Sequence, residues 1–432
     1  MAVSIILEDL PTHTQYVPLA VLGYCFTHSG FLDPVWNMID WTMKTRDHTP
    51  TQKLQDMLVS IMAGNTSVAQ INTRLRPDLT LAAAWQRQQF ADQSGIATVL
   101  NSLTLEQIQQ LRQGSQGLFR RYSQTMLHDY RRHWLVLDLD LTGLQASRRA
   151  EGSQKGYVSG KRNQYGRQVV RGSVPTYHET VWSRLYPGNQ SGTTTLKPAV
   201  MQIQNFLGLT QAQRQRTIVR GDAGLGTDEN INWLLWNHYQ VVMKGYSGKR
   251  AASFARQLHG DAWLKDPTGT RWIAWAHNPP RFGRRVNVFV LRWPGKTGML
   301  YGTLLSTLLV LTPVATWQVY DGRGAAEIEI KADKQGLRLP KRRKQSFLAQ
   351  EGLILLTDLA HNRVSWMHHW VLEETTFADF GTARIVDELF HIPGRVEMKD
   401  GHIQKVALLK SHPYAESMRD ILQNLLDFFG NP

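Results

Sequence analysis

Four residues around position 327 have types and spacing that suit a charged reaction centre. The pattern Y-x2-R-x3-E-x6-K is formed by Tyr320, Arg323, Glu327 and Lys334. On a helix, Arg323 lies one turn before Glu327 and Lys334 two turns after it, so a single face carries a carboxylate between two cations. An exposed helix with ordinary i,i+4 ion pairs would show the same charges. Four fixed residue types make the pattern more specific than a single ion pair.

Two further carboxylates lie in the apolar run from Trp134 to Leu141. Residues two apart on a strand point to the same face, so Asp138 and Asp140 are alternatives for one site. Two acids on an apolar strand are costly to bury without a cation, which favours a metal site. The competing interpretation is a strand-end aspartate that is hydrogen-bonded to the backbone.

The chain resembles the DDE transposases of bacterial insertion sequences that carry the Y-R-E-K signature. In that family the first aspartate stands in a D-x-T context on the first strand of an RNase H-like fold. Asp140-Leu141-Thr142 matches this context, which favours Asp140 over Asp138. A second aspartate follows a later strand, in a context similar to the Arg-Gly-Asp-Ala-Gly sequence around Asp222. The interval between Asp222 and Glu327 leaves room for the β-rich insertion of the family.

The resemblance implies a catalytic triad of Asp140, Asp222 and Glu327 that holds two Mg²⁺ or Mn²⁺ ions. One ion would activate the nucleophile and the other would stabilise the leaving oxygen. Hydrolysis would free a 3′-hydroxyl at the end of the element, and the same site would use it to attack target DNA in line. The implied activity is cut-and-paste DNA transposition.

The resemblance also implies which side chains contact DNA near the cleaved end. Charged hydrogen-bond donors beside a metal centre suit phosphate contacts, and this role is expected for Arg323, Lys334 and Tyr320. Lys244 is a further expected DNA contact. The partners are therefore double-stranded DNA, as terminal inverted repeats and as target, and a second copy in a homodimer that synapses two DNA ends.

An aromatic residue of the insertion has its own expected role. In relatives such a residue stacks on a flipped base while a DNA hairpin forms. Tyr301 lies nearest to that place in this sequence, and Trp293 is the second choice. The relatives use Trp there, so the hairpin step is left open, and an ordinary core role for either residue competes with stacking.

Composition agrees with a polyanionic partner and excludes several classes of site. The chain has 49 Lys and Arg against 35 Asp and Glu, a formal charge of +14, which attracts nucleic acid or anionic membrane. Cys25 is the only cysteine, so an internal disulfide and a multi-cysteine metal site are excluded. The basic run from Lys341 to Lys344 is either a DNA-tracking segment or a solvated loop.

Neither export nor a membrane span is expected. The N-terminus carries acidic residues where a secretory signal would be basic. The uncharged stretch from Thr297 to Tyr320 is interrupted by Gly298, Gly302 and Pro313, which favours a strand, a loop and a helix start. The expected location is the bacterial cytoplasm, in association with the nucleoid.

The elements that must position these residues form an α/β protein. Helical periodicity dominates the N-terminal third, whereas alternating and apolar strand patterns begin at Trp134. The predicted fold is an RNase H-like mixed sheet with helices on both faces, interrupted by a β-rich insertion domain and preceded by an α-helical N-terminal domain. Five segments are predicted: 1–132, a helical DNA-binding region; 133–250, the first part of the catalytic core; 251–312, the insertion; 313–375, the second part of the core; and 376–432, a hairpin and a helix for possible dimerisation.

Two other functions stay open from the sequence. A metal-dependent nuclease on the same fold would need the same carboxylates but would not join strands. A domesticated, non-catalytic DNA-binding protein would be expected to have lost a carboxylate, and all three are present here. Transposition is the preferred interpretation.

Overall fold

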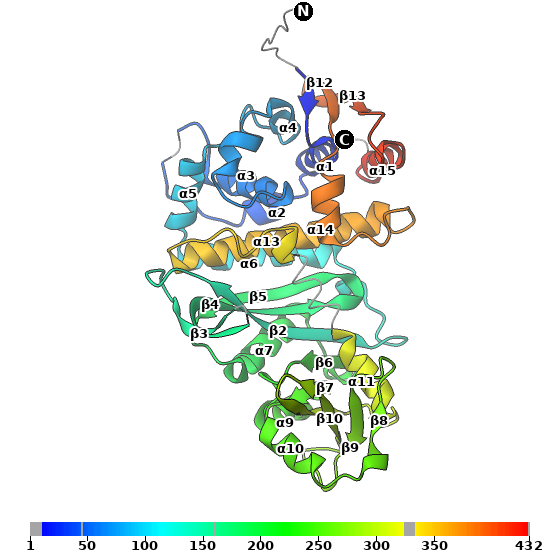
Figure 1. Ribbon diagram of the computed structural model, residues 1–432. Coiled ribbons are helices and arrows are strands. Elements are labelled where there is room, and N and C mark those ends of the chain that lie inside the picture. Colours follow the sequence, from blue (N-terminus) through cyan, green and yellow to red (C-terminus); the bar gives the residue numbers. More distant parts are fainter. Residues whose placement is uncertain (1–10, 45, 159, 324–332, 431–432) are drawn as a thin grey trace, which may run out of the picture. The chain divides into compact units, whose positions relative to one another are not determined.

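The computed structural model describes residues 11–44, 46–158, 160–323 and 333–430. The chain divides into two compact units: unit 1 comprises Met1–Tyr122 and Lys331–Pro432, and unit 2 comprises Ser123–Ile330. The mixed α/β class is confirmed, since both units combine helices with strands (Figure 1). The division differs from the five predicted segments, because the C-terminal hairpin and helix belong to the same unit as the N-terminal helices.

Unit 2 is built on a ten-stranded mixed sheet with the order β3-β4-β2-β6-β7-β11-β10-β9-β8, and β5 pairs with β4. β2 is parallel to β6 and β6 is parallel to β7, whereas the other pairs are antiparallel. Leu135, Leu137 and Leu139 of β2 are fully buried, as the apolar run predicts for a central strand. The strands are β2 (Leu135–Gln145), β3 (Gln154–Val158), β4 (Lys161–Val174), β5 (Glu179–Pro187), β6 (Thr217–Gly221), β7 (Gln240–Gly245), β8 (Leu264–Lys265), β9 (Trp272–Trp275), β10 (Asn287–Gly295) and β11 (Gly298–Ser306).

The predicted insertion, residues 251–312, contributes its strands to this same sheet. β11 pairs antiparallel with β7, from Thr303 beside Gly245 to Ser306 beside Val242. β10, β9 and β8 then follow outward. Pairing with β7 satisfies the backbone groups that a separate β-domain would leave on an open edge. The segment is therefore an extension of the central sheet.

Short helices of unit 2 start where the sequence supplies caps. The Thr227 side chain accepts from Asn230 N–H at 3.2 Å before α9, and Thr312 accepts from Ala315 N–H at 3.2 Å before α11. Pro313 occupies the first turn of α11, where its missing N–H is harmless. The helices are α7 (Leu196–Leu207), α8 (Gln211–Gln215), α9 (Asp228–Trp236), α10 (Gly248–Ala255) and α11 (Pro313–Asp321).

Unit 1 is mainly helical and is centred on one buried helix, α13 (Phe347–Met367). Most residues of α13 are buried on every side of the helix, which is typical of a core helix. α13 packs against α6, α3 and α5. The other helices include α1 (Val17–His28), α2 (Asp33–Trp36), α3 (Pro50–Met62), α4 (Leu79–Ala84), α5 (Gln93–Ser102), α6 (Leu105–Tyr122), α14 (Thr382–Arg384) and α15 (Ala415–Phe428). None of the helices in the described part of the chain has the length and apolar character to cross a membrane.

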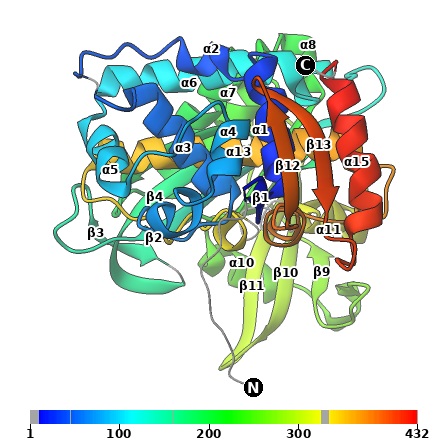
Figure 2. The same cartoon turned by 90° about the horizontal axis from the view of Figure 1, so that it is seen from above.

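A small sheet completes unit 1. β12 (Gly394–Lys399) pairs with β1 (His13–Thr14) and with β13 (His402–Leu408). Figure 2 shows β12 and β13 beside α1 and α15. The tight turn uses Asp400 and Gly401, both with positive φ, as a two-residue hairpin requires. The apolar stripe of α15, which the sequence assigned to possible dimerisation, is buried within unit 1 at Met418, Ile421, Leu422 and Leu425.

One buried charge in α13 leads to a stability prediction. The Arg363 side chain is fully buried, and its Nε and Nη2 have no hydrogen-bond partner in the described part of the chain. Nη1 donates to the Leu359 carbonyl, and burial lowers the pKa of Arg363. Because an unpaired buried cation is unfavourable, we expect Arg363→Met to raise the free energy of unfolding by about 1–3 kcal/mol.

Chemical denaturation of the purified variants would measure this effect. Arg342→Met is the matched control, since Arg342 is equally buried but its guanidinium donates to the carbonyls of Asn65 and Leu337. That substitution should destabilise the protein by leaving buried acceptors without donors. Equal losses in both variants would show that Arg363 has a favourable role in the fold.

Candidate active site

Parallel pairing of β2 with β6 brings two predicted carboxylates together. The last pair in the β2–β6 ladder is Leu139 with Gly221, and the residues that follow them are Asp140 and Asp222. Because the two strands are parallel, the residues that follow this pair lie on the same side of it, toward the carboxyl ends of the strands. Asp222 stands directly after β6, where the chain leaves the sheet. The register therefore places the two aspartates as neighbours.

Asp140 is held in a polar setting that remains open to solvent. Its side chain is 22% exposed. The Thr142 hydroxyl donates to Oδ2 at 2.9 Å, and Nη1 of Arg323 lies 3.6 Å from Oδ1. Asp140 and Thr142 share a strand face because they are two residues apart. The D-x-T motif thus has a local purpose, since the threonine orients the aspartate.

The Asp222 carboxylate is mostly buried, and its negative charge is only partly compensated by the described groups around it. Its Oδ1 is buried and has no hydrogen-bond partner among the described residues. Burial raises the pKa of Asp222, and the nearby Asp140 raises it further. Arg323 and the backbone N–H groups of Gly224 and Leu225 act in the opposite direction. Two adjacent carboxylates with one partial counter-charge form a site that a bound cation would stabilise.

The loop after Asp222 needs glycine at two positions. A β-carbon at Gly224 would lie 3.1 Å from Oδ1 of Asp222, and one at Gly226 would collide with the carbonyl of Lys244. The Gly226 carbonyl accepts from the Tyr246 N–H at 2.9 Å. Glycine therefore lets the loop pass close to β7 and keeps the space beside the Asp222 carboxylate open.

Asp138 has a different environment from Asp140. Its side chain is 2% exposed and accepts two hydrogen bonds from Arg220, Nε to Oδ1 at 2.6 Å and Nη2 to Oδ2 at 2.7 Å. The register sets Asp138 directly beside Arg220 on the parallel neighbour. Nη1 of Arg220 also donates to the Val319 carbonyl of α11 at 2.6 Å. Asp138 thus forms a bidentate ion pair that ties β2 and β6 to α11.

Three of the predicted DNA-contacting residues lie together at the end of α11. The ring of Tyr320 has the Lys244 ammonium 5.0 Å from its centroid and the Arg323 guanidinium at 5.6 Å. Lys244 also lies 5.5 Å from the ring of Trp293. Tyr320 is only 4% exposed and belongs to a core cluster with Trp317. Its ring is thus a buried platform beside which the two cations lie.

The two candidate stacking residues point to opposite faces of the β10–β11 hairpin. Trp293 pairs with Leu300 and Arg292 pairs with Tyr301, and neighbouring positions on a strand alternate in direction. Trp293 also packs on Gly302, on the face shared with Lys244. Tyr301, the first choice from the sequence, therefore lies on the other face, and the second choice Trp293 joins the Lys244–Tyr320 cluster.

The remaining two residues of the signature are Glu327 and Lys334. Glu327 lies outside the described residues. Lys334 is described but belongs to unit 1, whereas Asp140 and Asp222 belong to unit 2. Within the described ranges, no group of three or more His, Cys, Asp or Glu side chains converges in a geometry that could hold a metal ion. The described part of the predicted triad is the Asp140–Asp222 pair.

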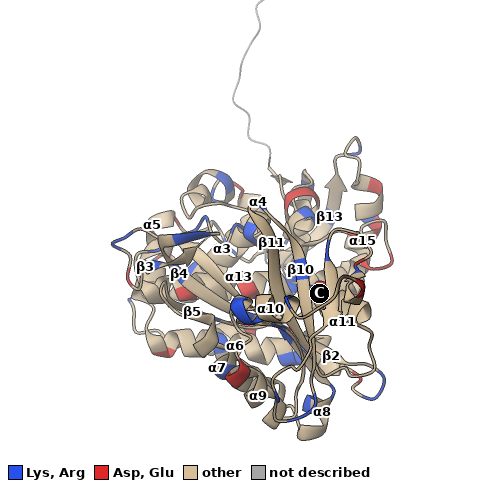
Figure 3. Cartoon of the chain, turned by 60° about the horizontal axis from the view of Figure 1, so that its bottom comes forward, with Lys and Arg blue, Asp and Glu red and all other residues tan. Residues whose placement is uncertain are grey.

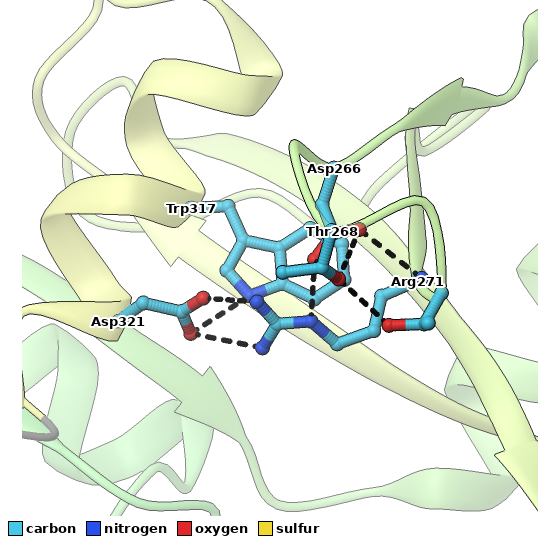
Figure 4. Close-up of polar contacts among 6 residues, drawn as sticks. Asp266, Thr268, Arg271, Trp317 and Asp321 are labelled. Carbon is cyan, nitrogen blue, oxygen red and sulfur yellow. Dashed lines mark hydrogen bonds and ion pairs between the residues drawn. The ribbon is translucent and has the colours of Figure 1, made fainter.

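A second arginine holds α11 from the outer strands, as Figure 4 shows. Arg271 at the β8–β9 turn donates to Asp266 at 2.7 Å and to Asp321 at 2.5 Å. Its guanidinium also lies 4.6 Å from the ring centroid of Trp317, whose Nε1 donates to Asp321 at 3.0 Å. Because Asp321 ends α11 two residues before Arg323, this cluster fixes the helix that delivers Arg323 to Asp140.

Sequence reasoning did not find Arg220 or Arg271. A signal existed for Arg220, because it precedes Gly221-Asp222 and carries the charge that a buried Asp138 needs. No comparable signal existed for Arg271, whose partner Asp321 lies fifty residues away in sequence. Figure 3 shows further basic residues on α10 and along the β3–β4 hairpin of unit 2. These positions add positive charge to the unit that carries the aspartates.

Comparison with known proteins identifies the family. The model of the family described as "Transposase DDE domain group 1" matches residues 29–428. No curated protein matches the chain significantly. One solved structure with detectable likeness is a piggyBac transposase synaptic complex with hairpin DNA, at 11% identity and a TM-score of 0.45, covering 86% of this chain and 79% of that chain. Since the family model spans nearly the whole sequence, the chain belongs to the group 1 family of transposase DDE domains.

Proposed function

We propose that this transposase cleaves the ends of its element and transfers the 3′-hydroxyl strands into target DNA by two-metal-ion phosphoryl transfer. The observation that carries the proposal is the juxtaposition of Asp140 with the buried Asp222. The mixed sheet has Asp140 on the first strand of unit 2 and Asp222 after a later, parallel strand. This arrangement is the one expected of an RNase H-like core.

The two aspartates fit divalent cations by their own chemistry. Carboxylate oxygens are the ligands that Mg²⁺ and Mn²⁺ prefer. The buried Oδ1 of Asp222 has no hydrogen-bond partner in the described chain. Asp140, Asp222 and, as third ligand, Glu327 would hold the ions, which when bound supply activation of the attacking oxygen and charge stabilisation at the leaving oxygen.

The surrounding side chains would position DNA rather than react with it. Thr142 orients Asp140, and Arg323 lies against the same carboxylate. With metal bound, Arg323 would turn its donors toward a phosphate at the scissile bond, a contact suited to a guanidinium. Lys244 would bind a neighbouring phosphate, and Lys334 belongs to the same proposed set. Two copies of the chain would synapse two DNA ends.

A cleavage and joining assay tests the proposal. A labelled duplex that ends in the inverted repeat flanking the gene would be incubated with Mg²⁺, Mn²⁺ or EDTA and a supercoiled target plasmid. We expect nicks at the repeat end and joined products with either metal, and neither with EDTA. Cleavage without joining would support the nuclease alternative. DNA binding without either reaction would support a domesticated binding protein.

Arg271 supplies a prediction about positioning within unit 2. We expect Arg271→Met to lower the cleavage rate at saturating DNA by about 10- to 100-fold, because small displacements of reacting groups cost that much. The DNA affinity should change little, since the Arg271 guanidinium is already engaged with Asp266, Asp321 and Trp317. Single-turnover cleavage and fluorescence anisotropy measure the two effects.

Arg250→Met is the matched control for this test. Arg250 pairs with Asp228 through two short hydrogen bonds, and this pair is exposed to solvent to about the same extent as the Arg271–Asp321 pair. Arg250→Met should cost about 1 kcal/mol of stability or less. Arg271→Met should cost more, because it also leaves the buried Asp266 carboxylate without its cation, and only Arg271→Met should slow cleavage of the folded protein. Arg271→Lys should restore part of the rate because it keeps one charged contact. Equal rates for the Arg271→Met and Arg250→Met variants would refute the positioning role.

A further inference from the structure

A basic pocket in unit 1 is not used by the proposed reaction. It has a volume of about 390 Å³ and lies between the loop 341–344 and the N-terminal turn of α5. Its described lining includes four consecutive cations and no acidic or aromatic side chain. The lining residues are Ser67, Val68, Gln93, Ser94, Ala97, Lys341, Arg342, Arg343, Lys344 and Leu353.

The loop that carries the cations is held in place by buried hydrogen bonds. The Gln350 side chain, 5% exposed, accepts from Lys344 N–H at 2.9 Å and donates to the Arg342 carbonyl at 3.2 Å. Arg342 is itself 3% exposed and donates to the carbonyls of Asn65 and Leu337. The loop conformation is thus set before any ligand arrives, which lowers the entropic cost of binding.

The four cations of the loop 341–344 differ in burial and in role. Arg342 anchors the loop, and burial beside Arg338 lowers its pKa to about 9. Lys341 and Arg343 are exposed at the rim. Lys344 is half-buried, and burial lowers the pKa of its ammonium group. Cations gathered in one pocket, two of them exposed at its rim, attract an anion.

The opposite wall offers neutral polar groups in Gln93 and Ser67. Gln93 and Ser94 belong to the first turn of α5, whose cap Asp92 accepts from the N–H groups of Ser94 and Gly95 at 2.7 and 2.9 Å and from the Ser94 hydroxyl at 2.5 Å. The Asp92 carboxylate is therefore directed to the helix end. Hydroxyl and amide groups beside cations are typical partners of phosphate oxygens. None of the described lining residues is aromatic, so they offer no ring on which a base would stack.

We propose that this pocket binds phosphates of the DNA backbone, independently of base sequence, through Lys341, Arg343 and Lys344. The inference rests on the proposed function, because it names a second contact surface for the same substrate. Fixed cations in a concave site concentrate the polyanion and release counterions from it. The basic run, for which the sequence left two interpretations open, then has a binding role.

Salt-dependent DNA binding tests the proposal. The affinity of the wild type and of the Lys341→Ala/Arg343→Ala variant for a fluorescent duplex of random sequence would be measured at several salt concentrations. Losing two phosphate contacts should lower the slope of log K against log salt by about 2 and the affinity by about tenfold. The equal-charge control is Arg395→Ala/Lys399→Ala on β12, where both residues are exposed. Melting temperatures would verify that all three proteins are folded.

The outcomes separate this inference from the proposed function. If the wild type binds the duplex and the pocket variant and the β12 variant lose affinity equally, the pocket proposal alone is overturned. The loss of net charge would then explain both effects. No duplex binding by the wild type at low salt would overturn both proposals. If inorganic tripolyphosphate raises the melting temperature of the wild type and duplex does not, the pocket belongs to a free anion and its assignment to DNA is wrong.

Discussion

Asp222→Asn should abolish DNA cleavage while leaving the protein folded. We expect the cleavage rate to fall at least about 10³-fold, since a metal-bound carboxylate contributes several kcal/mol of charge stabilisation in the transition state. Stability should not fall, because the raised pKa of Asp222 shows that its ionised form is disfavoured in the folded state, by burial first and by Asp140 second. A neutral amide removes both penalties. Asp140→Asn should have a comparable effect on the rate.

Cleavage of end-bearing DNA and thermal melting would be measured on the same preparations. Asp228→Asn is the control, since Asp228 lies close in sequence but pairs with Arg250. That variant should cleave at nearly the wild-type rate. A large drop in the melting temperature of the Asp222→Asn variant would mean that its lost activity reflects unfolding. Full activity of Asp140→Asn together with an inactive, folded Asp138→Asn variant would move the first carboxylate to Asp138.

Asp138→Ala should produce the largest loss of stability. The substitution removes a buried, bidentate partner and leaves the Arg220 guanidinium without its compensating charge. Breaking such a pair costs about 3–5 kcal/mol. For a unit of this size the melting temperature should fall by roughly 6 to 20 °C. Differential scanning calorimetry of the intact chain would measure the shift.

A double variant separates the contribution of the Asp138–Arg220 ion pair to stability from that of side-chain packing. Asp138→Leu with Arg220→Met replaces the pair by apolar side chains of similar volume, which is often neutral or stabilising for a buried ion pair. We expect it to recover most of the lost stability. Cleavage should recover less, because the Arg220 contact with the Val319 carbonyl of α11 is still missing. If Asp138→Ala melts like the wild type, the pair does not hold the strands together.

Asp138 and Asp140, two acids on strand β2, have different environments. Asp138 lies two residues before Asp140, and both match an alternating pattern. The difference arises from the parallel partner, which sets Arg220 beside Asp138 and the unpaired end of β6 beside Asp140. A cation fixed in the protein compensates the first acid. Among the described residues, the second is contacted by Arg323 at 3.6 Å and by a threonine hydroxyl, so it is the acid of this strand that we assign to the proposed metal site.

Local features of the sequence predicted much of the framework. The apolar run before Asp140 is a central strand, the sequence Asp400-Gly401 forms a hairpin turn, and α15 has a buried apolar stripe. Each depends on interactions between residues a few positions apart, which periodicity reports directly. The membership in a transposase family was predicted from the signature and is confirmed by the family match.

The features that the sequence could not supply all depend on pairing between distant segments. The outer strands of residues 251–312 extend the central sheet because β11 pairs with β7. Since side chains alternate between the two faces along a strand, Trp293 lies on the face of Lys244 and Tyr301 lies on the other face. Arg271 reaches Asp321 only through that sheet.

By itself, the sequence determined the chemistry of this protein: which acids and cations it carries, and the helices and strands on which they lie. The tertiary structure alone decided that Asp138 forms a buried pair with Arg220 and that Asp140 lies beside Asp222, the arrangement on which the proposed metal site rests. Register and burial set those environments, and a shift of one residue in strand pairing would exchange the faces on which the side chains lie.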